Sequence, residues 1–174
     1  MQGSSSSRNL IILLVVGAVI IFAVGLGLAG VFAGRAPQIG EPAPTFRVTT
    51  IDGQVIDSSA MAGKVLVVNF FATWCQPCRQ EAGDLEALWG EYQDKGVLFV
   101  AIAYKDVDAK VREFVQQAGI TFPVANSSTD IGRQFGVTGV PETYVIGPDG
   151  ILRYRRIGVI DPPALRQVLN MLIP

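Results

Sequence analysis

The sequence predicts an α/β fold for most of the chain, and two kinds of pattern support this class. Two runs, VLVVNFF at 65–71 and VLFVAIA at 97–103, consist almost entirely of β-branched, aromatic and other apolar residues. Such runs are typical of strands that are covered on both faces. After each run, apolar residues recur at the spacing of an amphipathic helix. This alternation predicts a sheet with helices packed on both of its faces.

Turn and capping residues mark the limits of the predicted elements. Glycine accepts the left-handed conformation that ends many helices, and Gly96 and Gly119 follow the first two helical patterns. Pro148-Asp149-Gly150 indicates a turn between two strands, and Asp161 before two prolines indicates the start of a last helix. In chain order we expect a strand at 46–50, a strand at 65–71, a helix at 77–92, a strand at 97–103, a helix at 107–118, a short segment at 122–125, a helix at 129–135, a hairpin of 142–146 with 151–156, and a helix at 161–172.

An apolar segment near the N-terminus predicts a membrane anchor. Residues 10–34 form a stretch of 25 residues without a charge, and a helix needs about 20 apolar residues to cross a bilayer core. The alternative is a cleaved signal peptide, whose apolar region normally runs about 7 to 15 residues. We expect a retained transmembrane anchor at 10–34 after a short cytoplasmic tail at 1–9. Residues 35–44 contain three prolines and are expected to form an extended tether to a domain at 45–174.

The flanking charges say little about the orientation of this anchor. Arg8 lies near one end and Arg35 near the other, so the positive-inside count is almost balanced. A short tail before the span and a whole domain after it favour an N-terminus inside the cell. The expected location is therefore the cell membrane, with the domain on the extracytoplasmic side, where thiol–disulfide chemistry operates.

Composition excludes several kinds of chemistry. The chain has no histidine, so it cannot hold a Ser–His or Cys–His pair, a His-ligated zinc ion or a His-ligated haem. Two cysteines cannot form a four-cysteine zinc site. A net charge of −1 without a Lys/Arg cluster argues against nucleic acid as a partner. We expect no metal and no cofactor other than a redox-active pair of thiols.

The two cysteines lie in Trp74-Cys75-Gln76-Pro77-Cys78, where the predicted strand at 65–71 leads into a helix. Free N–H groups and the dipole at a helix N-terminus favour an anion, so we expect the pKa of the Cys75 thiol to fall. Cys78 can then attack a disulfide formed on Cys75, and the pair can alternate between dithiol and disulfide. A fixed structural disulfide and half of a shared metal site are the alternatives. Redox function is favoured, because so short a loop adds little stability.

These motifs resemble the active site of the thioredoxin fold. The run Val68–Cys78 is similar to its cysteine motif, and Val140-Pro141 before Glu142-Thr143-Tyr144 is similar to its cis-proline loop. The resemblance covers the chain from about Gly40 to the C-terminus.

More narrowly, the chain resembles the membrane-tethered reductases of cytochrome c maturation, the TlpA/ResA/DsbE-like group. The segments that carry this resemblance are the anchor, the opening Gly40–Phe46, the run Cys75–Glu81, and Pro141-Glu142-Thr143, with Tyr104-Lys105-Asp106 and Gly150–Tyr154 similar to the DsbE branch.

The resemblance implies a cis peptide bond between Val140 and Pro141, beside the cysteines, with the Val140 backbone free to pair with an extended substrate. An ordinary trans proline at the start of a strand is the alternative. Trp74 is expected either to shield one side of the site or to pack in the core. The residues expected to contact substrate are Trp74, Gln76, Pro77, Val140, Pro141 and Glu142.

Glu81 is a candidate acid–base residue from periodicity alone. It lies three residues after Cys78 within the apolar stripe of the helix, so it should face the sheet. A buried carboxyl has a raised pKa and can exchange protons with the thiols, and the resemblance implies a similar role for a glutamate here. A partly exposed glutamate in the first turn is the alternative.

Three further expectations concern residues around this site. Asn69 stands where ordinary thioredoxins carry a buried aspartate, which leaves acid–base work to Glu81. Glu142 is expected on the opposite lip, either as a second catalytic group or as a charge offered to the partner. We expect Trp89 in the core, and the arginines at 153, 155 and 156 on a solvated hairpin face.

The resemblance implies an extracytoplasmic thiol–disulfide oxidoreductase in which Cys75 attacks a partner's disulfide and Cys78 resolves the mixed disulfide. Its expected partners are apocytochrome c or a maturation thiol carrier, and a transmembrane electron donor. A general oxidase or isomerase of secreted proteins is an alternative, since direction depends on redox poise. So is a non-catalytic binding module on the same fold.

Two other functions fit the residues less well. A peroxiredoxin-type peroxidase carries proline and threonine where this chain has Val68 and Ala72. A copper carrier of this fold adds a histidine and a wider cysteine spacing, and neither is present here.

Overall fold

The computed structural model describes residues 9, 12–19, 36–127 and 129–173. The chain divides into two compact units, residues 1–35 and 36–174. In the first unit, residues 12–19 are helical. None of the helices in the described ranges is both long and apolar enough to span a membrane. The rest of the predicted anchor, at 10–11 and 20–34, lies outside the described residues.

In the described part of the second unit, five strands form a mixed sheet in the order β5-β4-β3-β6-β7. The strands β3, β4 and β5 run parallel, and β6 and β7 are antiparallel to their neighbours. The strands are β3 Val65–Phe71, β4 Val97–Tyr104, β5 Val124–Ser127, β6 Glu142–Ile146 and β7 Leu152–Ile157. A separate hairpin pairs β1 Arg47–Thr49 with β2 Val55–Asp57.

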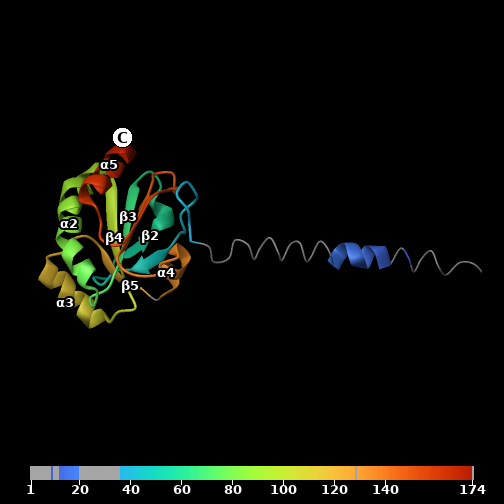
Figure 1. Ribbon diagram of the computed structural model, residues 1–174, viewed down its shortest axis with the longest axis horizontal. Coiled ribbons are helices and arrows are strands. Elements are labelled where there is room, and N and C mark those ends of the chain that lie inside the picture. The colour runs from blue at the N-terminus through green and yellow to red at the C-terminus, as the bar shows by residue number, and fades with distance from the viewer. Residues whose placement is uncertain (1–8, 10–11, 20–35, 128, 174) are drawn as a thin grey trace, which may run out of the picture. The chain divides into compact units, whose positions relative to one another are not determined.

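Helices lie on both faces of this sheet, as Figure 1 shows with α2 and α3 on its left and α4 on its right. The helices are α2 Gln76–Tyr92, α3 Asp108–Ala118, α4 Thr129–Phe135 and α5 Pro162–Leu172, with 3-10 turns at Ser58–Met61 and Gln93–Lys95. The predicted α/β class, the order of strands and helices, and the hairpin are thereby confirmed. The strand β2 was not predicted.

The expected end signals are present. Gly96 and Gly119 both adopt left-handed conformations, with φ of 77° and 66°. Asp161 caps α5 by accepting a hydrogen bond from the N–H of Ala164 at 3.2 Å. The two glycines permit a positive φ that other residues rarely adopt. Asp161 supplies an acceptor for a backbone N–H that has no partner within the helix.

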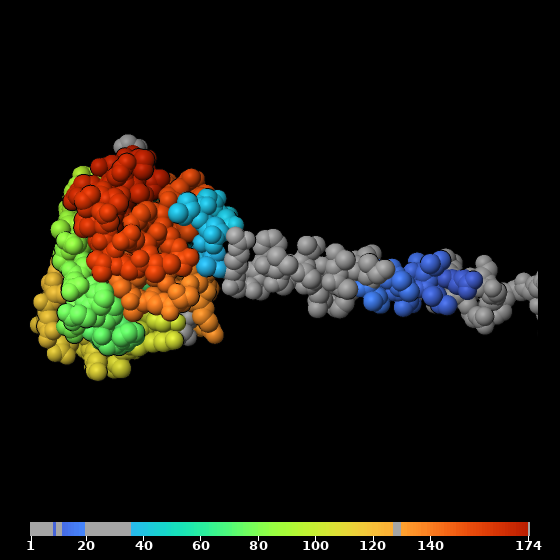
Figure 2. All heavy atoms as spheres, in the orientation of Figure 1, coloured from blue at the N-terminus to red at the C-terminus, as the bar shows by residue number. Residues whose placement is uncertain are grey.

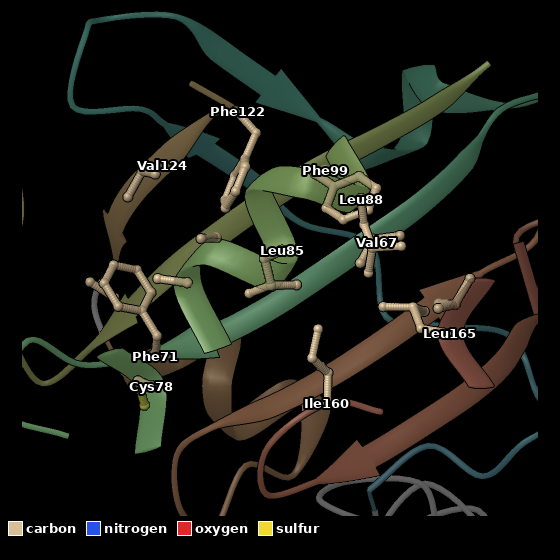
Figure 3. Close-up of a cluster of buried hydrophobic side chains, with 14 of the residues drawn as sticks. Val67, Phe71, Cys78, Leu85, Leu88, Phe99, Phe122, Val124, Ile160 and Leu165 are labelled. Carbon is tan, nitrogen blue, oxygen red and sulfur yellow. The ribbon is translucent and has the colours of Figure 1, made fainter. Parts of the chain in front are cut away.

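Side chains of β3 alternate between two apolar cores. Val67 and Phe71 belong to the core formed with α2, α3 and α5, while Val68 and Phe70 belong to the core formed with the β1–β2 hairpin and α4. Figure 3 shows the first core, in which Cys78 lies next to Phe71. This alternation follows from the two-residue period of a strand, and it explains why the whole of β3 is apolar apart from one residue, Asn69.

The segment expected to be a tether is largely part of the domain. The compact unit begins at Ala36, and Pro37 is buried. Gly40 donates its N–H to the Leu152 carbonyl at 2.8 Å, and Leu152 donates to the Glu41 carbonyl at 2.9 Å. Residues 36–44 therefore pack along the start of β7. The prolines that suggested an extended linker instead support an extended edge segment, where a missing N–H costs little.

Candidate active site

The cysteines lie where the end of β3 turns into α2. Cys75 occupies the N-cap position of α2, and its Sγ accepts the N–H of Cys78 at 3.2 Å. Pro77 stands in the first turn, where its lack of an N–H leaves no bond unmade. Cys75 and Cys78 are joined by a disulfide. The helix start therefore directs a backbone donor at the Cys75 sulfur, and such a donor stabilises a thiolate when the pair is reduced.

The proline loop approaches this sulfur from the other side. The Val140–Pro141 peptide bond is cis, which confirms the expectation from the resemblance. The Val140 carbonyl oxygen lies 3.5 Å from the Cys75 Sγ. Gln76 and Pro77 are exposed beside the disulfide, whereas Val140 is half-buried. Of the residues predicted to contact substrate, Gln76 and Pro77 therefore lie at the surface, whereas Pro141 is buried.

Glu81 lies three residues after Cys78 in α2 and is buried, with 1% of its surface exposed. Its Oε2 accepts the N–H of Ile160 at 2.9 Å, and its Oε1 accepts the Asn69 amide at 3.0 Å. Burial raises the pKa of the Glu81 carboxyl, although the two hydrogen bonds oppose part of this rise. The prediction that Glu81 faces the sheet is confirmed, and the alternative of a partly exposed first-turn residue is wrong.

Asn69 organises the polar centre of the sheet. Besides Glu81, its amide donates to the hydroxyl of Thr143 at 3.0 Å. All three side chains are buried, so their hydrogen bonds satisfy polar groups that water cannot reach. Asn69 therefore places a neutral donor, not a second carboxylate, next to Glu81.

Glu142 is not on the surface. Its side chain is fully buried and accepts hydrogen bonds from the N–H of Thr138 at 3.0 Å and the hydroxyl of Tyr144 at 2.7 Å. Arg155 pairs with it at 3.1 Å. The expectations that Glu142 contacts substrate or offers charge to a partner are therefore wrong for its side chain. It instead fixes the loop of residues 138–141.

The hairpin arginines differ from one another. Arg153 pairs with Asp149 at the surface, as expected. Arg155 was wrongly expected to be solvated: 21% of its side chain is exposed, and it lies over the Tyr144 ring at 5.4 Å. Burial and the neighbouring Glu142 carboxylate raise the pKa of Tyr144.

Trp74 stands at the surface next to Cys75, with 64% of its area exposed. Its indole N–H donates to the Lys105 carbonyl at 3.4 Å. The alternative that it packs in the core is wrong. Trp89 by contrast is half-buried against the first core, with its ring 5.8 Å from that of Phe99.

Asp106 is a structural residue of the site that was not predicted. Its carboxylate accepts the N–H of Thr73 at 2.5 Å and the Thr73 hydroxyl at 3.0 Å, and so ties the loop after β4 to the residue before Trp74. Lys105 precedes it with a φ of 53°, the left-handed region that side chains rarely adopt. The sequence signalled only a resemblance at Tyr104-Lys105-Asp106 and gave no role for the carboxylate.

Within the described residues, no group of three or more Cys, Asp or Glu side chains is arranged to hold a metal ion. The chemistry that the described residues offer is thiol–disulfide exchange: two sulfurs, a buried carboxyl of raised pKa and a cis-proline loop.

Comparison with known proteins gives the same result. The AhpC/TSA family matches residues 39–155. The chain is 35% identical over 170 residues to the thiol-disulfide oxidoreductase ResA of Bacillus thuringiensis strain Al Hakam, which covers 96% of this chain and 95% of the relative. It is 31% identical over 137 residues to the thioredoxin-like protein YneN of Bacillus subtilis, covering 77% of this chain and 80% of the relative.

A solved structure extends the similarity to the fold. A thiol:disulfide interchange protein of the thioredoxin family from Chlorobium tepidum is 31% identical, covers 80% of this chain and 100% of its own, and superposes with a TM-score of 0.72. The central mixed sheet with flanking helices is therefore a thioredoxin fold.

Proposed function

The chain belongs to the AhpC/TSA family and is a thiol–disulfide oxidoreductase, and we propose that it reduces disulfides of proteins during cytochrome c maturation. The observation that carries the thiol chemistry of this proposal is the placement of Cys75 at the start of α2, between the Cys78 N–H and the Val140 carbonyl. A nucleophilic sulfur needs a stabilised thiolate, and although Cys75 itself is only 5% exposed, its neighbours Trp74 and Gln76 lie at the surface.

The reaction begins with the reduced protein. The Cys75 thiolate attacks one sulfur of a disulfide in the partner, forms a mixed disulfide with it, and releases the other partner sulfur as a thiolate. Cys78 then attacks the Cys75 sulfur. The Cys75–Cys78 disulfide forms, the partner leaves with both sulfurs reduced, and two electrons have passed to the partner.

Glu81 takes the proton that Cys78 must lose before this second attack. A carboxyl with a raised pKa holds and releases protons closer to neutral pH than an ordinary one. Its fixed bonds to Ile160 and Asn69 keep the carboxyl in place during exchange.

The loop of residues 138–141 holds the substrate in this proposal. An extended segment of the partner pairs with the Val140 backbone beside the cis bond, which brings the partner's disulfide to Cys75. Trp74, Gln76 and Pro77 contact the same segment from the other side of the cysteine. Glu142 acts through the loop that it fixes and does not touch substrate.

The pathway assignment rests on similarity of motifs and relatives. The Pro141-Glu142-Thr143 motif and the ResA-type relatives support apocytochrome c, or a thiol carrier that acts before it, as the substrate. In this proposal residues 10–34 anchor the chain in the cell membrane, the domain faces the extracytoplasmic side, and a membrane protein returns electrons to Cys75 and Cys78.

Trapping the mixed disulfide tests the proposal. In cells that carry the full chain with Cys78→Ala, the partner should stay linked to Cys75, and the linkage should disappear on reduction. The matched control carries Cys75→Ala as well and should capture nothing. Capture of apocytochrome c or a maturation thiol carrier supports the proposal. Capture of many unrelated secreted proteins contradicts it and favours a general oxidase or isomerase.

A further inference from the structure

A surface hollow of about 320 Å³ lies beside the cysteines, between the start of α2 and α3. Its lining includes Thr73 and Trp74, which directly precede Cys75, and Arg79, which directly follows Cys78. Figure 2 shows the first turns of α2, in green, beside the yellow surface of α3. A partner segment that reaches Cys75 therefore passes next to residues that line the hollow.

The hollow has an apolar floor and a fixed wall. Phe114 is buried below it, and the Arg79 guanidinium lies 5.3 Å from the centre of the Phe114 ring. Arg79 also donates from Nε to the Thr73 carbonyl at 3.0 Å. This bond and the ring contact hold the guanidinium at the edge of the hollow, so a ligand does not have to order it.

The opposite wall is equally constrained. Thr73 is held by the Asp106 carboxylate, and the Trp74 indole N–H is bonded to the Lys105 carbonyl. An exposed tryptophan that is fixed in this way offers a rigid apolar surface at little cost in conformational entropy.

The charges at the rim favour an anion. Arg79 and Lys110 lie in the lining with one carboxylate, Glu113. The Glu113 carboxylate accepts a hydrogen bond from Gln117, and neither cation has an ion-pair partner among the residues that the structure describes. The rim therefore has an excess of one positive charge, and its two cations are free to pair with an anionic ligand.

We propose that this hollow is a specificity subsite for an acidic side chain of the disulfide substrate, which lies against Trp74 and pairs with Arg79 and Lys110. The inference rests on the proposed function, because it requires that an extended protein segment be the substrate. It adds a preference of charge and position: an Asp or Glu close to the cysteine that Cys75 attacks.

A series of activated peptides tests the subsite. Each peptide contains one cysteine joined to 4-thiopyridine, with Glu, Gln or Lys placed at successive positions on both sides of the cysteine. The full chain carrying Cys78→Ala is reduced and mixed with each peptide. The Cys75 thiolate bonds to the peptide sulfur, the bond to the pyridyl sulfur breaks, and the released pyridinethiolate takes a proton from water and is measured by absorbance.

The expected result is a preference at one position. There, Glu should raise the second-order rate about threefold to tenfold over Gln, as one or two exposed ion pairs allow, and Lys should lower it. The preference should weaken as salt is added, because exposed charges are screened. It should fall with Arg79→Gln and with Lys110→Gln, and Lys110→Glu should favour the Lys peptide at that position.

Two controls separate the subsite from a general effect of charge and from a disturbed fold. Lys64→Gln removes the same charge before the start of β3, at the opposite end of that strand from Trp74, and should leave the preference intact. The Lys110 side chain makes no hydrogen bond or ion pair with the described residues, so its variants test the charge even if Arg79→Gln disturbs the fold.

The outcomes distinguish the inference from the proposed function. Peptides that all react at one rate overturn the subsite and leave the oxidoreductase in place. A charge effect that is equal at all positions and lost equally with Lys64→Gln also overturns it, because long-range attraction would then suffice. If no peptide reacts although Cys75 is reduced, the attack by Cys75 itself is contradicted.

Discussion

The Asn69 amide donates to the Glu81 carboxylate over 3.0 Å, inside a sheet where both side chains are buried. A neutral donor of this kind stabilises a carboxylate less than a cation does, so burial dominates and the Glu81 pKa is raised. Glu142 is equally buried, but it faces Arg155. The two buried carboxyls thus have different partners, Asn69 for Glu81 and Arg155 for Glu142, and this difference agrees with the proposed proton exchange at Glu81 and loop support by Glu142.

Replacing Glu81 with Gln should slow the second step of exchange. Without the carboxyl, Cys78 must lose its proton to water, and we expect a loss on the order of 10²-fold near neutral pH. The rate profile against pH should also lose the inflection caused by Glu81. Release of a trapped peptide from Cys75, followed in rapid mixing experiments, measures this step. Glu91→Gln removes an exposed carboxylate of the same helix and serves as the control. Equal rates in both variants would contradict a proton-transfer role.

The raised pKa of Glu81 also predicts how stability depends on pH. The folded protein holds the Glu81 proton more tightly than the unfolded chain does. The protonated carboxyl therefore contributes its full share to the free energy of unfolding below the ordinary pKa of 4.5, and this share is lost as pH rises through the higher pKa of the folded protein. Each unit of difference corresponds to about 1.4 kcal/mol. The oxidised wild type should therefore lose free energy of unfolding above pH 4.5 relative to Glu81→Gln.

This pH window is separate from that of the other shifted carboxyls. Hydrogen bonds from neighbouring groups hold the pKa values of Asp52, Asp57 and Asp149 below 3.8. Their stabilisation is lost only as pH falls through those lower values. Urea titrations at several pH values between about 4 and 8 measure the difference in free energy of unfolding between wild type and Glu81→Gln. The expected scale is about 1.4 kcal/mol for each unit by which folding raises the Glu81 pKa. Parallel curves for the two proteins would contradict it.

The regular elements near the site could be predicted because their patterns are long. The seven residues of β3 are all buried, and the apolar stripe of α2 places Glu81 on its inner face. The strand β2 has only three residues, too few to show a period. The cis bond at Val140–Pro141 leaves no mark in hydrophobic spacing, so only the resemblance predicted it.

Glu142 and Arg155 could not be placed from sequence for a topological reason. The strand β6 lies between β3 and β7, and all five of its residues are buried. A glutamate at the start of a short strand suggests a solvated position unless this order is known. Its cation is supplied by β7, thirteen residues later. The pairing therefore depends on strand order, which local patterns do not give.

Arg155→Met should lower the free energy of unfolding of the oxidised protein more than Arg153→Met does in the same hairpin. The substitution leaves the buried Glu142 carboxylate without its cation. Because Arg155 is itself partly exposed and other donors remain, we expect a loss of about 2 kcal/mol, below the range for a fully buried pair. Arg153→Met removes an exposed pair of the same hairpin and should cost under about 1 kcal/mol. Urea unfolding compares them, and equal losses would mean that the buried pair contributes no more than the surface one.

Asp106→Ala should loosen the residues that precede Cys75. The change removes the acceptor of the Thr73 N–H and hydroxyl, and a part-buried donor left without a partner costs about 1–2 kcal/mol. Trp74, the next residue, should then move more freely. In a Trp89→Phe background, where Trp74 is the remaining tryptophan, this appears as lower fluorescence anisotropy. Asp94→Ala removes a carboxylate beyond the end of α2 and should change neither quantity. If Asp106→Ala destabilises the protein but leaves the anisotropy of Trp74 unchanged, Asp106 supports the fold without positioning Trp74, and the fixed wall of the hollow beside Cys75 must depend on the Lys105 backbone instead.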